Sequence, residues 1–289
     1  MSGRMEVEAG PRAGSDIGLD TAEPDTAEPD AAGAGAKEDR HFVTALARGL
    51  SVLACFGPGR TSLANHDIAE ACGLPRSTVS RLTYTLTKLG YLQHMPELGR
   101  YRLGTATIAL SSAALGGLDV RAIARPVLRA VAEAANASVG LGVRDRLSMR
   151  YVDCQRGPAA ISLNLDTGSR ISLARSAMGR AYVAVCPDRE RAGIYEDLKA
   201  LDPVAWPVLR AGLDRAVEEH RELGCCTSFG EWQETVCAIA VGFHPGGGLP
   251  PMSVNCGAPT VITDARFLLE VARPRLIDAV RSLDGVMGA

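Results

Sequence analysis

Apolar residues between positions 40 and 104 follow helical spacing and then strand spacing. They recur every three or four positions in three segments, and they alternate with polar residues in two shorter ones. The predicted helices cover residues 41–56, 66–72 and 75–89, and the predicted strands cover 91–94 and 100–103. Three helices followed by a hairpin is the element order of a winged helix-turn-helix domain, which we place at residues 39–104.

Turn residues set the ends of the second and third helices. Asn65 is suited to cap the second helix, and Gly73 supplies a sharp turn after it. Pro75 suits the first turn of the third helix, where its missing N–H costs nothing. One side of the third helix carries Val79, Leu82, Leu86 and Leu89. We expect that side to face the core.

The opposite side of the third helix carries hydroxyls, a tyrosine ring and cations, without an acidic residue from 75 to 88. An isolated helix of this kind could simply face water, but here it follows a helix-turn-helix and precedes a hairpin. In the DNA major groove, arginine bridges guanine acceptors, while serine and threonine donate or accept. Arginines alternating along the hairpin suit phosphates or a minor groove. The predicted DNA contacts are Arg76, Ser77, Thr78, Ser80, Arg81, Tyr84, Lys88, Arg100 and Arg102.

Charge is distributed unevenly along the chain. The formal net charge is only −2, yet residues 41–104 hold seven basic and three acidic side chains. Residues 1–40 hold ten acidic and four basic side chains, and residues 105–289 hold equal numbers of acidic and basic side chains. A net charge of +4 supplies few phosphate contacts per subunit. Useful DNA affinity therefore predicts at least two copies of the domain on one site.

The first 38 residues have almost no large apolar side chains and contain a five-residue acidic repeat at 21–25 and 26–30. This composition predicts a disordered acidic tail. The start of the chain has no apolar run of the kind found in signal peptides. The longest apolar stretch, 106–118, is too short to span a bilayer. We expect a cytoplasmic protein with no membrane partner.

Eight cysteines occur without any Cys-x-x-Cys spacing, so neither a metal site nor a disulfide framework is predicted, and no cofactor is expected. They suit a reducing compartment, most of them as small core residues. A redox-sensing regulator remains an alternative, with Cys225, Cys226 and Cys237 as the sensing group. A thiol enzyme is a weaker alternative. Because the chain has no nucleophile elbow, phosphate loop or metal-binding histidine spacing, we expect it not to be an enzyme.

The rest of the chain alternates helices and strands, which predicts an α+β domain with an antiparallel sheet and packed helices. A linker helix at 105–119 precedes a domain at 120–289. The expected helices cover 106–118, 120–135 with a break at Pro126, 177–185, 188–198, 208–223 and 267–283 with a break at Pro274. The expected strands cover 139–143, 149–154, 160–165, 226–229, 237–243 and 252–256.

From about Phe42 onward the chain resembles the IclR family of bacterial transcriptional regulators. The matching words are Leu-Ala-Arg-Gly-Leu-Ser-Val-Leu at 46–53, Gly-Leu-Pro-Arg-Ser-Thr-Val-Ser-Arg-Leu at 73–82, Leu-Gly-Tyr-Leu at 89–92, Gly-Arg-Tyr-Arg-Leu-Gly at 99–104 and Ser-Ala-Met-Gly-Arg-Ala at 176–181. The resemblance implies an N-terminal winged helix, a GAF-like effector domain and a homodimer or homotetramer on double-stranded operator DNA. It also implies a small-molecule effector that changes DNA affinity or the recruitment of RNA polymerase.

The same resemblance implies an effector cavity in the C-terminal domain. Its predicted lining is Ala174, Ser176, Ala177, Gly179, Cys237, Ser253 and Asn255. Ser253 and Asn255 alternate along one strand, so they point the same way and suit a carboxylate or carbonyl. Two of the matching words are similar to those of regulators of aromatic-acid catabolism, and Trp232 favours a flat ligand. We therefore expect a small organic acid, with an aromatic acid as the narrower expectation.

Overall fold

The computed structural model describes residues 41–57, 59–116, 119–159 and 161–288. The tail predicted at 1–38 lies outside these residues, as does Pro58 in the predicted helix-ending turn. Within the described chain, no helix is long and apolar enough to cross a membrane.

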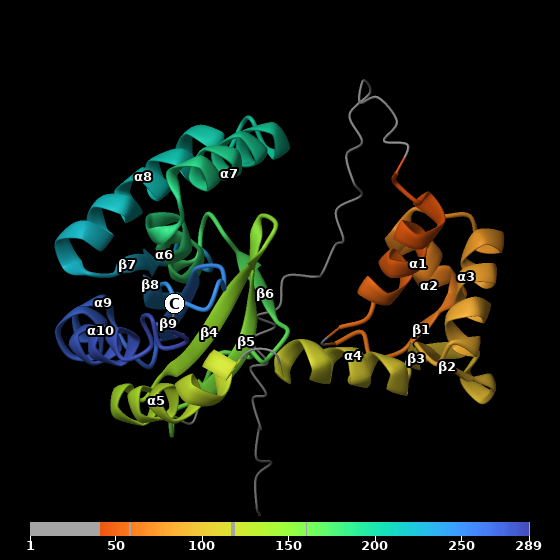
Figure 1. The fold of residues 1–289 in the computed structure, drawn as a ribbon, viewed down its shortest axis with the longest axis horizontal. Helices are drawn as coiled ribbons and strands as arrows, with labels where there is room; N and C mark the ends of the chain where they lie inside the picture. The colour runs from red at the N-terminus through yellow and green to blue at the C-terminus, as the bar shows by residue number, and fades with distance from the viewer. Residues whose placement is uncertain (1–40, 58, 117–118, 160, 289) are drawn as a thin grey trace, which may run out of the picture.

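The N-terminal part of the described chain is a winged helix-turn-helix, at the right of Figure 1. Its elements are α1 (Thr44–Ala54), β1 (Leu63–Ala64), α2 (Asn65–Cys72), α3 (Arg76–Lys88), β2 (Leu92–Met95), the 3₁₀ turn Pro96–Leu98 and β3 (Arg100–Leu103). The strands form a small antiparallel sheet in the order β1-β3-β2. Strand β1 was not predicted, because two residues carry no readable periodicity. The predicted helices and hairpin are confirmed.

Three details at the helix ends differ from the sequence prediction. Ala64, not Asn65, is the N-cap residue of α2, and the Asp67 carboxylate accepts a hydrogen bond from the Ala64 amide at 2.9 Å. Pro75 is the N-cap of α3 rather than a first-turn residue. Leu89 is 61% exposed instead of buried, because α3 ends at Lys88 and Gly90 turns the chain away with φ of +78°.

Helix α4 (Thr105–Gly116) leads from the wing into the second half of the chain, and α5 (Asp119–Ala135) follows it. The break expected at Pro126 is wrong, since α5 continues through it. Pro126 and Ala122 both lie on the exposed side of α5. The Ala122 carbonyl freed by the missing proline N–H can therefore bind water, which lowers the cost of the proline.

The C-terminal half is built on a six-stranded antiparallel sheet in the order β6-β5-β4-β9-β8-β7. The strands are β4 (Ser138–Asp145), β5 (Ser148–Arg156), β6 (Arg170–Ser172), β7 (Cys226–Phe229), β8 (Val236–Phe243) and β9 (Met252–Pro259). The strand predicted at 160–165 is wrong. Residues 161–166 are irregular, and β6 follows instead at the edge of the sheet.

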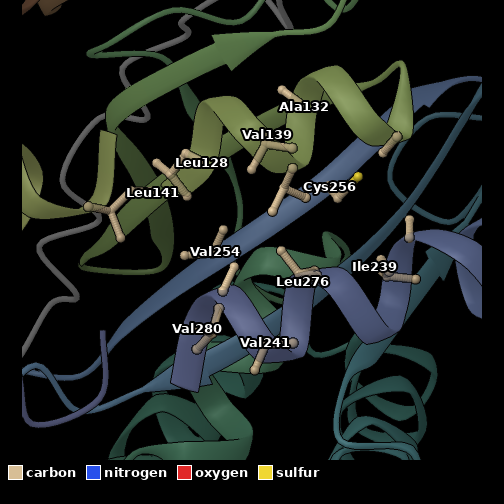
Figure 2. Packing of buried hydrophobic residues seen from close by; sticks show 14 of the residues in the cluster. Leu128, Ala132, Val139, Leu141, Ile239, Val241, Val254, Cys256, Leu276 and Val280 are labelled. Carbon is tan, nitrogen blue, oxygen red and sulfur yellow. The ribbon is translucent and has the colours of Figure 1, made fainter. Parts of the chain in front are cut away.

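Helices cover both faces of this sheet (Figure 1). One face packs against α5, α9 (Ala265–Phe267), a π-helical turn (Leu268–Ala272) and α10 (Arg273–Arg281). The close-up in Figure 2 shows Leu128 of α5, Leu276 of α10 and Val254 of β9 meeting in that core. The π-turn ends just before Pro274, near the predicted break.

The other face packs against α6 (Ala177–Val185), α7 (Asp188–Leu201) and α8 (Trp206–Leu223). Helix α6 lies directly on β8, β9 and β7, while α7 and α8 lie further out. The predicted class, an α+β chain with a winged helix and an antiparallel sheet carrying helices, is confirmed.

Candidate functional site

The polar side of α3 faces outward. Arg76, Ser77, Ser80, Arg81, Tyr84 and Lys88 are exposed, and Thr78 is half-buried. Tyr84 keeps 64% of its surface accessible. Within the described chain, the Arg76 and Arg81 guanidinium groups have no ion-pair or hydrogen-bond partner, so their donors are available to a ligand. Their contact with DNA stays a prediction.

A hydrogen-bond link that is partly buried holds α3 against α2. Asn65, freed from capping, donates to the Ser80 hydroxyl at 3.3 Å and accepts from the Thr83 hydroxyl at 3.1 Å. Thr83 is fully buried and also bonds the Val79 carbonyl. This link fixes the rotation of α3, and therefore which side chains it presents outward.

The two arginines of the hairpin differ. Arg102 is exposed, and its Nε donates to Gln93 on the neighbouring strand at 3.0 Å. Arg100 instead donates to the Ser62 carbonyl at 2.9 Å and to Asp67 at 3.1 Å. Arg100 thereby ties the wing to α2, and its side chain stays 38% exposed. Any contact of either with DNA stays a prediction.

A small enclosed cavity lies between the sheet and the start of α6, with a volume of about 10 Å³, room for about one water molecule. It is lined by Tyr151, Leu163, Leu165, Ile171, Ser176, Ala177, Ser228, Trp232, Val236, Ala238 and Asn255. Most of this lining is apolar, and none of it is charged. A ligand here would be held by shape and neutral hydrogen bonds.

Two polar atoms of the lining are buried without a partner: the Trp232 Nε1–H donor and the Asn255 Oδ1 acceptor. Asn255 uses its amide nitrogen to donate to the Tyr151 hydroxyl at 2.9 Å. Burial raises the pKa of the Tyr151 phenol far above its usual range, so the phenol stays neutral. Because an unsatisfied buried polar atom destabilises a protein by about 1–3 kcal/mol, a water molecule or ligand that bonds both atoms would stabilise the cavity.

Of the residues predicted to form this cavity, Ser176, Ala177 and Asn255 line it. Ser253 lies on the same face but donates to the Met178 carbonyl at 2.9 Å, outside the lining. Ala174 is also buried outside the lining. The Gly179 amide, predicted to be a donor for an anion, already donates to the Ser176 hydroxyl at 3.1 Å.

Cys237 was expected in the cavity and is not there. It packs on the opposite face of the sheet, among the residues beneath α5 and α10, while its neighbours Val236 and Ala238 line the cavity. Strand β8 is buried on both faces, so no polar alternation marks which residues face which side. The sequence did not predict Tyr151, Ser228 or the hydrogen-bonding role of Trp232. These residues come from separate segments of the chain, and no local pattern shows that they meet.

Charges outside the cavity hold the segment that carries Trp232. The buried Arg180 guanidinium pairs with Glu231 and donates to the Thr227 carbonyl at 2.8 Å. Arg215 of α8 also pairs with Glu231, at 2.5 Å. Burial lowers the pKa of Arg180, and the Glu231 carboxylate opposes this effect. Position 231, next to Trp232, is therefore anchored to α6 and α8.

The cysteines first considered for redox sensing are poorly suited to it. Cys225 and Cys226 are fully buried, and Cys237 is 2% exposed. Burial raises the pKa of Cys225 to about 11 and also raises those of Cys226 and Cys237. Because the thiolate is the reactive form, these three thiols do not form an accessible sensing group at neutral pH.

Comparison with known proteins covers both halves of the chain. The family profile described as the IclR helix-turn-helix domain matches residues 45–96, and the bacterial transcriptional regulator IclR C-terminal profile matches residues 112–284. The regulator TsaQ1/TsaQ2 of Comamonas testosteroni is 32% identical over 249 residues, covering 86% of this chain and 89% of its own. The regulator XynR of Escherichia coli is 27% identical over 69% of this chain and 79% of its own.

Solved structures agree with this comparison. An IclR family transcriptional regulator from Brucella abortus is 40% identical, with a TM-score of 0.75, and the match covers 87% of this chain and 95% of the other. An IclR homologue from Microbacterium hydrocarbonoxydans, complexed with 4-hydroxybenzoate, has the same fold, with 21% identity, a TM-score of 0.65 and coverage of 84% and 98%. These relatives are regulators rather than enzymes. The chain belongs to the IclR family of DNA-binding transcriptional regulators.

Proposed function

We propose that this regulator binds operator DNA through α3 and the wing, and that a small aromatic acid bound beneath Trp232 changes its operator affinity or its activation of a promoter. The observation that carries the ligand proposal is the pair of unpartnered atoms, Trp232 Nε1 and Asn255 Oδ1, in one enclosed cavity. The exposed guanidinium groups of Arg76 and Arg81, which have no partner among the described residues, support the DNA proposal.

The two unpartnered atoms define complementary groups on the ligand. Trp232 offers a hydrogen to an acceptor such as a carboxylate oxygen, and Asn255 Oδ1 accepts from a donor such as a ring hydroxyl. Apolar side chains between them, including Leu163 and Val236, suit a flat ring. A hydroxylated aromatic acid carries all three features. The homologue crystallised with 4-hydroxybenzoate holds a molecule of this class.

A carboxylate in this cavity would meet no cationic side chain. Ser176 and Ala177 place the first turn of α6 at the cavity, and the positive end of a helix dipole favours an anion. With the helix dipole as the only positive field among the described lining residues, the cavity suits an acid with no more than one negative charge.

Ligand entry requires the cavity to enlarge, because about 10 Å³ holds only about one water molecule. Trp232 is half-buried and lies on an irregular segment between β7 and β8, so its displacement is the simplest opening. Because Glu231 is next to Trp232, this displacement would also strain the ion pairs of Glu231 with Arg180 and Arg215. Ligand binding would thereby shift the positions of α6 and α8, which pack on this face of the sheet.

We also propose that the regulator acts as a homo-oligomer. The winged helix has a modest positive excess, so two copies on one operator would double its phosphate contacts. Helix α1 exposes Leu46 and Leu50, 61% and 58% accessible, on the same side one turn apart. Exposed leucines at helical spacing suit packing against a second copy.

The ligand proposal is tested by titrating the full chain with 4-hydroxybenzoate, following tryptophan fluorescence and the melting temperature. The chain has two tryptophans, which gives a matched pair of variants. Trp206 lies at the start of α8, away from the cavity lining. We expect the fluorescence response to persist in Trp206→Phe and to vanish in Trp232→Phe, with binding weakened by about fivefold to tenfold through loss of one hydrogen bond.

Benzoate and cyclohexanecarboxylate serve as the competing probes. Benzoate lacks the hydroxyl donor for Asn255, and cyclohexanecarboxylate also lacks the flat ring, so both should bind more weakly. Equal binding of all three acids, or an unchanged response in Trp232→Phe, would contradict the ligand proposal while leaving the DNA proposal intact.

A further inference from the structure

The winged helix contains a close pair of thiols that none of the functions above uses. Cys55 follows the last turn of α1, and Cys72 is the last residue of α2. Their Sγ atoms are 3.1 Å apart, closer than two sulfur atoms in ordinary contact. Both side chains belong to the core where α1, α2 and α3 meet.

The two thiols differ in accessibility. Cys55 is 5% exposed and also approaches the Ser51 carbonyl at 3.3 Å, whereas Cys72 is only half-buried. The hydrogen bond between the two thiols lowers the pKa of Cys72, although partial burial opposes this. A partly accessible thiol with a lowered pKa beside a buried one is the arrangement of an attacking cysteine and a resolving cysteine.

We propose that Cys55 and Cys72 form a redox modification site that takes a peroxide and closes to a disulfide, lowering the affinity of the winged helix for DNA. The Cys72 thiolate attacks hydrogen peroxide, breaks its O–O bond and becomes a sulfenic acid as hydroxide leaves. The Cys55 sulfur then attacks the Cys72 sulfur and forms the S–S bond. The second hydroxide leaves with the Cys55 proton as water. Two thiols are oxidised and one peroxide is reduced.

The geometry permits this step without unfolding. A disulfide has an S–S distance of about 2.05 Å, so the sulfur atoms need to approach by only about 1 Å. The intervening residues hold β1 and all of α2. The disulfide would therefore fasten the end of α2 to the end of α1 within an existing core.

The closure acts next to the element that faces DNA. Cys72 precedes Gly73, which has φ of +62° and forms the turn between α2 and α3. A shift at the end of α2 is passed to α3 through this turn and through the link from Asn65 to Ser80 and Thr83. Base contacts depend on distance and direction, so a displaced α3 loses them. This last step depends on the proposed DNA-binding function, whereas formation of the disulfide does not.

The first arm of the test is chemical. The full chain is reduced and then treated with increasing concentrations of hydrogen peroxide. It is digested under conditions that block thiol exchange, and the peptides are measured by mass spectrometry. We expect a peptide pair joined through Cys55 and Cys72, absent from Cys55→Ser and from Cys72→Ser. Cys154→Ser is the matched control, because Cys154 is also half-buried but burial raises its pKa to about 11. It should leave the linked pair unchanged.

The second arm measures DNA affinity, using a duplex selected from a random-sequence pool by the reduced protein. Oxidation should weaken binding by about tenfold, equivalent to roughly one base contact, and a reductant should restore it. Cys72→Ser should bind alike under both conditions, and it provides the test if the more buried Cys55→Ser does not fold.

The outcomes separate the two proposals. A linked pair that never forms, or one that joins other cysteines, overturns the redox site. A linked pair that forms without any change in affinity overturns its regulatory effect. Failure of the reduced protein to select any duplex counts against the proposed DNA-binding function, and the peptide masses still decide whether the disulfide forms.

Discussion

At the scale of single residues, burial and hydrogen bonding decide which predicted contacts remain available. Arg81 and Arg102 are exposed, whereas Arg100 joins Asp67 and the Ser62 carbonyl. The sequence predicts the charge of the hairpin correctly, but alternation alone does not reveal an acidic partner 33 residues earlier. The same limit applies to Asn65, whose cap position was taken by Ala64 and whose amide instead connects α2 with α3.

Arg102→Ala tests the wing. Its guanidinium is exposed and bonds only Gln93 among the described residues, so we expect it to contact phosphate. The variant should weaken binding to all duplexes alike and reduce the slope of log affinity against log salt by about one. Arg189→Ala, an exposed arginine on α7, is the control and should leave the slope unchanged. A loss confined to the selected duplex would instead show that Arg102 reads a base.

At the scale of elements, strong periodicity and clear turn residues were sufficient to predict a helix or strand, whereas weak patterns were not. Helix α6 and strand β7 match the predicted ranges residue for residue. The sequence predicts a strand at 160–165 because the apolar residues at 161, 163 and 165 alternate as in a strand. These residues lie in an irregular segment, and the edge strand β6 follows after it. Leu163 and Leu165 pack onto the cavity side of the sheet without joining it, whereas Ile161 is 47% exposed.

Gly179 and Gly193 give a matched test of how tightly α6 is packed. A Cβ at Gly179 would lie 2.1 Å from the Leu173 carbonyl oxygen, whereas a Cβ at Gly193 would meet nothing within 4 Å. We expect Gly179→Ala to lower the free energy of unfolding by about 2–3 kcal/mol. Gly193→Ala, in the exposed middle of α7, should raise it by about 0.5–1 kcal/mol. Urea unfolding followed by circular dichroism measures both.

Equal effects of the two alanine substitutions on stability would mean that the first turn of α6 moves away from Leu173 to make room for the new Cβ. In that case the cavity beside this turn could enlarge by movement of α6, and a ligand could enter without displacement of Trp232.

At the scale of the whole molecule, the sequence predicts the order of the two halves and the local charge excess, but not the cavity. The cavity unites Tyr151 of β5, Ser176 before α6, Trp232 between β7 and β8, and Asn255 of β9. The first and the last of these residues are more than a hundred positions apart, and periodicity, which works over short windows, does not connect any of them. The family resemblance supplied three of the lining residues, and the other four predicted residues, Ala174, Gly179, Cys237 and Ser253, lie outside the lining.

The oligomer proposal is tested on α1. The double variant Leu46→Asp, Leu50→Asp places two charges on an exposed apolar side, so it should keep the helical content but lower the molar mass in light scattering to that of one chain. Val204→Asp, at a residue 90% exposed between α7 and α8, is the control and should not alter the mass. A mass unchanged by the double variant would place the contact between copies elsewhere.

The central claim is that the exposed side of α3 reads DNA sequence, and Arg81→Ala tests it most directly. Fluorescence anisotropy at fixed salt gives the ratio of affinities for a selected duplex and a random-sequence duplex. The Arg81 guanidinium has no partner among the described residues, so its loss should weaken binding to the selected duplex by about 1–3 kcal/mol and lower that ratio. An equal loss on both duplexes, or wild-type protein that binds neither duplex at low ionic strength, would contradict the claim.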